Sequence, residues 1–227
     1  MERRQIARFG LVSAWILVAG LLLSGPLTVI AVSHFYPQPV EWQGIEAYAR
    51  AFAPLQLITF GFGFAILAGS IGVVTSLVCL APPERRLFAA LTLVFLAMFG
   101  AVIGTNYMLQ LAVLKPALAA GQLAGLEFFA FNNPASVAMA LEMLGYAFFG
   151  VATWTLVPLV PGDGVARWCR RLGIANGVVS VLAAAWHAAL GFGGLVGFVG
   201  YLIWNVLIVV LAVDYLLYLR GLAVRER

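Results

Sequence analysis

Charged side chains are scarce in this sequence of 227 residues, where Asp, Glu, Lys and Arg together make up only 10%. Hydrophobic residues make up 63%, and the mean hydropathy is +1.03. Water-soluble domains usually carry about 25% charged residues, so this composition excludes an ordinary soluble domain. It predicts an integral membrane protein.

Residues that carry common catalytic or metal chemistry are also few. The HExxH, GxSxG and phosphate-binding glycine-loop motifs are absent. The two cysteines, Cys79 and Cys169, lack companion histidines at metal-ligand spacing, so no zinc motif is present. The only lysine, Lys115, lies at a predicted helix end, which argues against a buried retinal-type Schiff base. No metal site is predicted.

Long uncharged apolar runs are what the sequence does contain. A hydrocarbon core of about 30 Å needs about 20 apolar residues per helix. Six runs are long enough, and they predict one all-α domain with six transmembrane helices at residues 9–33, 54–80, 87–114, 134–160, 172–191 and 198–219. The glycine-rich stretch between the last two leaves their boundary open. The first run exceeds a signal-peptide apolar region and is counted as a span.

Basic residues are distributed unevenly along this arrangement. Eleven of the 13 Lys and Arg residues fall on one side, and the exceptions are Arg50 and Lys115. By the positive-inside rule that side is cytoplasmic, which predicts a multi-pass protein of the bacterial plasma (inner) membrane with both termini in the cytoplasm. The net charge of +4 then reflects topology, and no nucleic-acid binding is expected. Cys79 and Cys169 map to the same side, where thiols stay reduced.

Two features bear on how the helices pack. The outer loops, residues 34–52 and 115–133, are rich in apolar and aromatic residues, so they either cap the bundle or form an aromatic belt at the headgroups. Small residues spaced by four place a narrow face on several helices, which favours close packing in the bundle or at a homo-oligomer interface. These are Gly61 with Ala65 and Gly69, Gly100 with Gly104, Gly173 with Gly177, and Gly193 with Gly197.

Polar side chains within the spans gather at one depth, in the predicted outer half. Pairs spaced by four share one face of their helix, and these pairs are Asn106 with Gln110, Glu142 with Tyr146, and Tyr201 with Asn205. Tyr107, Trp186, His187 and Trp204 map to the same depth, and Gln56 and Thr59 lie close enough to join them. The pattern predicts a ligand-binding pocket. The alternative is that these groups only tie helices together.

Glu142 is the one carboxyl group of this set. A charged side chain at the centre of a spanning helix costs about 2.5 to 3.5 kcal/mol, so Glu142 is expected to face the bundle interior. His187 is its expected partner, and Glu142 is then either neutral or paired. As an alternative to binding, the two residues would form a catalytic pair that moves protons.

The run from Asn106 to Gly150 resembles a pattern in uncharacterised bacterial six-helix membrane proteins. In that pattern an Asn-Tyr-x-x-Gln helix leads through an Asn-Pro turn into an Ala-x-Glu-x-x-Gly-Tyr helix, and the match covers about a fifth of this chain. The family has no established activity. The resemblance implies only that one unit is formed by Asn106, Tyr107, Gln110, Glu142, Gly145 and Tyr146.

These observations favour a membrane protein that binds or transports a small or amphipathic molecule, with membrane lipids as its surroundings. A second hypothesis is an intramembrane isomerase or hydrolase that acts on a lipid-like substrate through Glu142 and His187. A third is a non-catalytic subunit of a larger membrane complex. No cofactor is expected, although a bis-histidine haem b would have to use His34 and His187, the only two histidines.

Overall fold

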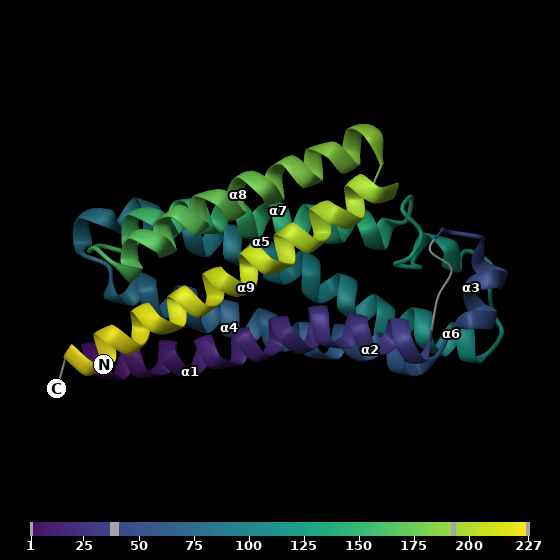
Figure 1. Ribbon diagram of the computed structural model, residues 1–227, viewed down its shortest axis with the longest axis horizontal. Helices are drawn as coiled ribbons and strands as arrows, with labels where there is room; N and C mark the ends of the chain where they lie inside the picture. The colour runs from purple at the N-terminus through teal and green to yellow at the C-terminus, as the bar shows by residue number, and fades with distance from the viewer. Residues whose placement is uncertain (1, 37–40, 192–193, 226–227) are drawn as a thin grey trace.

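The computed structural model describes residues 2–36, 41–191 and 194–225. Within these ranges the regular structure is entirely helical, and six helical segments are long and apolar enough to cross a membrane (Figure 1). The predicted all-α membrane bundle is therefore confirmed. The six segments are Arg3–Val32, Pro54–Leu80, Pro83–Ala119, Val137–Leu159, Val165–Leu190 and Val199–Val224.

Several of these segments combine more than one helix. The α-helices in the described ranges are α1 (Arg3–Leu22), α2 (Thr28–Phe35), α3 (Ile45–Ala51), α4 (Ile58–Leu80), α5 (Arg86–Leu109), α6 (Lys115–Ala119), α7 (Val137–Leu156), α8 (Val165–Leu190) and α9 (Gly194–Arg225). Helix α8 begins seven residues before the predicted span at 172–191, so the arginines of this region lie on its first turns. Long arginine side chains tolerate that position because their heads reach the membrane surface.

The two ends of the bundle differ in what they carry. Helix α1 begins and helix α9 ends at the same end of the bundle (Figure 1), which we call the arginine end and which also holds the turns at residues 81–85 and 160–164. The other end, which we call the capped end, carries α3 and residues 120–136. The assignment of the arginine end to the cytoplasm stays a prediction of the positive-inside rule.

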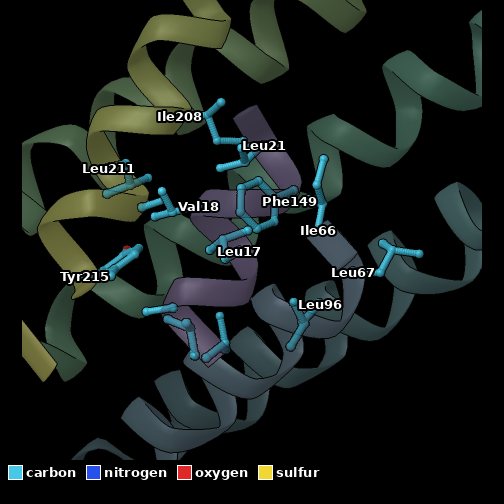
Figure 2. Close-up of a cluster of buried hydrophobic side chains, with 14 of the residues drawn as sticks. Leu17, Val18, Leu21, Ile66, Leu67, Leu96, Phe149, Ile208, Leu211 and Tyr215 are labelled. Carbon is cyan, nitrogen blue, oxygen red and sulfur yellow. The ribbon is translucent and has the colours of Figure 1, made fainter. Parts of the chain in front are cut away.

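The buried core runs along the length of the bundle and takes side chains from all six spans, and Figure 2 shows part of it. Its members include Leu17, Leu21, Ile66, Leu96, Phe149, Ile208 and Leu211, all with less than 5% of their surface exposed apart from Phe149, which is 5% exposed. Lipid tails are as apolar as leucine, so these contacts stabilise the bundle mainly through close packing.

Helices α1 and α4 pack at unusually short range because glycines face the opposite backbone. A Cβ atom added at Gly69 would lie 2.5 Å from the backbone nitrogen of Leu17, and one at Gly20 would lie 2.8 Å from that of Ile66. The predicted small-residue face on α4 is thus used inside the chain at Gly69. It is not used at Gly61, where an added Cβ would have no neighbour within 4 Å.

The other glycines of the predicted small-residue faces also divide into those that pack against a neighbouring helix and those that do not. A Cβ at Gly177 would lie 2.0 Å from Nε1 of Trp154, and one at Gly150 would lie 3.2 Å from the Cα of Gly177, so α7 and α8 meet at these glycines. Gly100 has no neighbour within 4 Å of an added Cβ, and its face lies on the surface of the bundle. Gly193 lies outside the described residues.

A second apolar cluster closes the capped end. It joins α3 to the end of the third span and to the following loop through Ile45, Tyr48, Leu114, Leu126 and Ala130. Gln110 supports the loop, because its Nε2 donates a 2.9 Å hydrogen bond to the carbonyl of Phe129. Of the two roles expected for these loops, capping is the one that the contacts show, although Phe128 remains 55% exposed.

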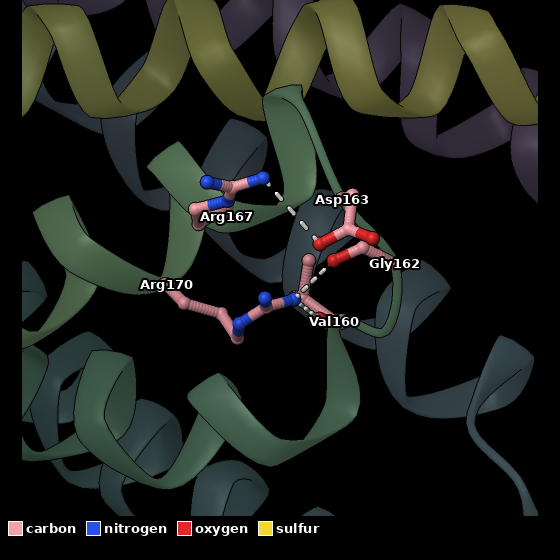
Figure 3. Close-up of polar contacts among 5 residues, drawn as sticks. All are labelled: Val160, Gly162, Asp163, Arg167 and Arg170. Carbon is pink, nitrogen blue, oxygen red and sulfur yellow. Dashed lines mark hydrogen bonds and ion pairs between the residues drawn. The ribbon is translucent and has the colours of Figure 1, made fainter.

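The turn between α7 and α8 is held at the arginine end by Arg170 (Figure 3). Its Nη1 donates to the carbonyl oxygens of Val160 and Gly162, at 2.8 Å each. Arg167 and Asp163 form a wider contact of 3.6 Å with both side chains largely exposed. The arginine that touches backbone is therefore the one expected to fix the turn.

Candidate functional site

Glu142 lies on the second turn of α7 and faces the neighbouring helix α5. Only 9% of its surface is exposed. Asn106 donates a 2.9 Å hydrogen bond to its Oε2, and the hydroxyl of Tyr107 donates a 3.3 Å bond to its Oε1. The carboxyl group thus points into protein and away from lipid, as its cost in hydrocarbon requires.

Close approach of α5 and α7 makes these contacts reachable. A Cβ atom added at Gly145, one turn beyond Glu142, would lie 2.5 Å from the side chain of Ile103. At this short separation Asn106 also reaches the α7 backbone, where its Nδ2 donates a 3.0 Å bond to the carbonyl of Ala138. One amide group therefore fixes both the helix and its acid.

Aromatic contacts extend this unit to α8 and α9. The hydroxyls of Tyr107 and Tyr146 lie 3.1 Å apart. The ring of Tyr146 packs edge-on against Trp204 of α9, with the ring centroids 4.5 Å apart. Trp204 in turn donates from Nε1 to the hydroxyl of Ser180 on α8, at 3.1 Å. Four helices are thereby linked at the depth of Glu142.

A cavity of about 330 Å³ opens beside this unit, towards α1, α4 and α9. We call it the polar cavity. The polar groups that line it include Ser24, Gln56, Thr59, Tyr107, Glu142, Tyr146, Tyr201 and Asn205. Tyr48 and Phe131 cover it from the capped end. Burial raises the pKa of Tyr48 to about 12, so its hydroxyl stays neutral there.

A kink in the first span shapes one wall of the polar cavity. Pro26 lies within a π-helical segment, Leu23–Leu27, and Gly25 departs from helical geometry with φ −93° and ψ −108°. Proline has no backbone N–H, so the ladder of helical hydrogen bonds is interrupted here. Ser24 and Thr59 exchange hydrogen bonds across the break, each hydroxyl donating to the other residue's carbonyl. Membrane helices tolerate proline when such side chains pair with the freed backbone.

A second cavity, of about 300 Å³, lies between α7, α8 and α9. We call it the lateral cavity. Apart from the residues that it shares with the polar cavity, its lining is mostly apolar. Its rim includes Leu182 and Trp186, which are 62% and 46% exposed on the bundle surface. It shares with the polar cavity the residues Phe131, Glu142, Tyr146, Tyr201 and Trp204. The two cavities therefore lie side by side, and Glu142 is part of the wall that they share.

Most of the residues proposed from the sequence line these cavities. Tyr107, Glu142, Tyr146, Tyr201, Trp204 and Asn205 line the polar cavity, and Trp186 lines the lateral one. Asn106 is fully buried and acts on the site through Glu142. Gln110 is also fully buried, but it binds the loop carbonyl of Phe129 and lines neither cavity.

The expected pairing of Glu142 with His187 is wrong. The hydrogen bonds that Glu142 accepts within the described part of the chain come from Asn106 and Tyr107 on α5. His187 lies in the last turn of α8 and lines neither cavity. The reason is that α7 turns the face bearing Glu142 towards α5, whereas the end of α8 lies at the edge of the bundle (Figure 1).

The histidines also bear on the haem hypothesis. His34 is exposed and lies on α2, on the opposite side of the bundle from the end of α8 (Figure 1). This placement gives no support to a haem held by His34 and His187 together. Among the described residues no group of three or more His, Cys, Asp or Glu side chains is arranged to hold a metal ion.

The residues that the sequence reasoning missed are those of the kink and the covering aromatic groups. Gly25 and Phe60 line the polar cavity without any polar atom in their side chains to draw attention. The sequence feature that indicates the kink is the Ser-Gly-Pro sequence inside an apolar run, because such a sequence kinks a spanning helix.

No protein-family model, curated protein or solved structure matches this chain.

Proposed function

We propose that this membrane protein binds, and through that binding transports, a small amphipathic molecule whose polar head occupies the polar cavity. The observation that carries the proposal is the position of Glu142. It lies where a cavity lined with hydroxyl, amide and carboxyl groups meets an apolar cavity that reaches the bundle surface. Small-molecule sites combine an apolar enclosure with a few polar groups that fix orientation, and this arrangement has both.

The contacts of Glu142 favour recognition over catalysis. A proton-transferring pair would need the histidine within hydrogen-bond reach of the acid or of a bound substrate. Glu142 is instead held by an amide and a phenol, which orient a carboxyl group and do not take up its proton. The enzyme hypothesis that uses Glu142 with His187 therefore draws no support from the site.

The proposal can be tested by asking whether the purified protein retains a ligand. Gly25→Leu would place a side chain in the polar cavity, and the atom nearest to an added Cβ is Oδ1 of Asn205, at 2.9 Å, which a side-chain rotation can move. Gly61→Leu adds the same side chain to an open surface of α4 and serves as the matched control.

Native mass spectrometry from mild detergent should show a bound species on the wild type and on Gly61→Leu. The same species should be lost from Gly25→Leu, while circular dichroism shows that all three proteins melt cooperatively. If the three proteins carry the same bound species, or if none carries any, the polar cavity is not the binding site and the proposal fails.

A further inference from the structure

The charge inside the two cavities has one sign. Glu142 is the only acidic residue among the described residues that line them, and none of those residues is a Lys, Arg or His. A carboxyl group removed from water is stable in its charged form only beside a positive charge with good hydrogen bonds. The chain supplies the hydrogen bonds from Asn106 and Tyr107, but the lining residues that the structure describes include no cationic side chain.

Aromatic rings surround the same space. Phe60 packs against Tyr107 and Phe131, with ring centroids 5.4 Å and 5.5 Å apart, and Tyr146 packs against Trp204 at 4.5 Å. All five residues line the polar cavity. The faces of aromatic rings carry partial negative charge, and rings arranged around a pocket recognise ammonium groups.

From these two observations we infer the class of the ligand: an amphipathic amine or quaternary ammonium compound whose cationic head lies against Glu142 and the surrounding aromatic rings. This inference rests on the proposed function, since it names the molecule that the polar cavity would hold. The ligand brings the positive charge that the walls lack. Its head is stabilised by an acid already held in place and by rings already packed.

The lateral cavity fits the apolar part of such a ligand. Its walls away from the shared residues include Met139, Met143, Val179, Leu182 and Ala183. Methionine side chains adapt to chains of different shape, and an exposed apolar rim lets a chain leave directly into the membrane. A molecule that spans both cavities would therefore keep its head at Glu142 and its chain between α7, α8 and α9.

The same walls discriminate against other amphipathic molecules. A sulfate or phosphate head would face the Glu142 carboxyl group without any cationic side chain from the described lining to offset its charge. Burying an unpaired anion is costly, so anionic detergents and phospholipids that must place a phosphate in the cavity are disfavoured. A neutral head would fit but would lose the ion pair.

The inference can be tested with three single-chain probes of equal length: tetradecyltrimethylammonium, tetradecyl sulfate and tetradecyl maltoside. Binding would be measured by isothermal titration calorimetry on the full chain in dodecyl maltoside. The ammonium probe should bind the wild type at least about tenfold more tightly than the other two, which corresponds to about 1.4 kcal/mol. Gly25→Leu should abolish its binding, and Gly61→Leu should not.

Two variants separate the contribution of the Glu142 charge to ligand binding from the contribution of the aromatic rings. Glu142→Gln keeps the shape and the acceptor oxygen of the side chain, and it should remove the preference for the ammonium probe. Phe131→Leu removes an aromatic ring from the cover of the polar cavity and leaves Glu142 unchanged. It should weaken binding of the ammonium probe more than binding of the maltoside probe. Because Phe131 makes none of the hydrogen bonds to Glu142, this variant stays informative even if Glu142→Gln fails to fold.

The outcomes distinguish this inference from the proposed function. If all three probes bind the wild type equally and all are blocked by Gly25→Leu, the cavity binds amphipathic molecules and the inference about charge is wrong. If no probe binds, or if Gly25→Leu changes nothing, both the inference and the proposed function fall. A preference for the sulfate probe would also overturn the inference.

Discussion

Asn106 of α5 and Glu142 of α7 are joined by a 2.9 Å hydrogen bond in the interior of the bundle. The same amide nitrogen donates to the carbonyl of Ala138, so Asn106 holds the acid and its helix together. A carboxyl group placed in a spanning helix is tolerated because this neighbour and Tyr107 provide its hydrogen bonds. This polar contact therefore holds α5 and α7 together, and Glu142 also forms part of a cavity wall.

The first prediction concerns the contact that Asn106 makes with α7. Asn106→Ala removes both hydrogen bonds and should lower the free energy of unfolding by about 1 to 2 kcal/mol, since interhelical polar contacts in membranes contribute modestly but an acid left without its donor adds a penalty. Thr105→Ala changes the adjacent, exposed residue of the same helix and should have little effect. Thermal unfolding in detergent, followed by circular dichroism, would compare them, and equal melting temperatures would contradict the prediction.

The second prediction concerns the contact between α1 and α4. Gly69→Ala would place a methyl group 2.5 Å from the backbone nitrogen of Leu17, so the two helices must separate. Overpacking of this kind costs about 1 to 3 kcal/mol. Gly61→Ala on the same helix meets no atom within 4 Å and should be neutral or stabilising, because alanine favours helix over glycine. Similar melting temperatures for the two variants would show that the close approach is not important for stability.

The polar unit around Glu142 could be predicted from the sequence, and the reasons are physical. Depth in the membrane follows from position along a span, and spacing by four places residues on one face. These two rules place Glu142 and Tyr146 on one face of their helix, and they place both residues at the depth of Tyr107. They work because a spanning helix is nearly regular and its length is fixed by the bilayer.

The same rules fail where the helix is irregular or where helix neighbours matter. Gln110 begins a π-helical segment, Gln110–Leu114, and its partner is the carbonyl of Phe129, supplied by a loop that folds back over the bundle. His187 was expected at the depth of Glu142, but depth along a span does not say which helix lies beside which. Only the packing of α7 against α5 decides that Glu142 turns towards Asn106.

The third prediction concerns the turn at the arginine end, where neighbouring arginines have different roles. Arg170→Ala removes two 2.8 Å hydrogen bonds to the carbonyls of Val160 and Gly162 and should cost about 1 to 2 kcal/mol of unfolding free energy. Arg167→Ala removes only an exposed 3.6 Å ion pair and should cost less than about 0.5 kcal/mol. Both variants remove one positive charge, so the comparison isolates the backbone contacts. Equal losses of stability would contradict this assignment.

The fourth prediction concerns orientation in the membrane. In a Cys79→Ala background the remaining cysteine, Cys169, is 1% exposed and should not react. Gln122→Cys at the capped end should then be labelled by a membrane-impermeant maleimide in intact cells, whereas Asp163→Cys at the arginine end should react only after the cells are permeabilised. Both native side chains are exposed, so accessibility is not limited by the fold. The reason is that arginine-rich segments are retained in the cytoplasm.

The converse labelling pattern would place the arginine end outside, and the ligand would then enter from the cytoplasmic leaflet. Labelling of both positions in intact cells would contradict a bundle of six crossings, because Gln122 and Asp163 lie on opposite sides of the span Val137–Leu159. The expected pattern instead puts the rim of the lateral cavity, with Leu182 and Trp186, in the outer half of the membrane. An amphipathic amine would then reach Glu142 sideways from the outer leaflet, with its chain still in lipid.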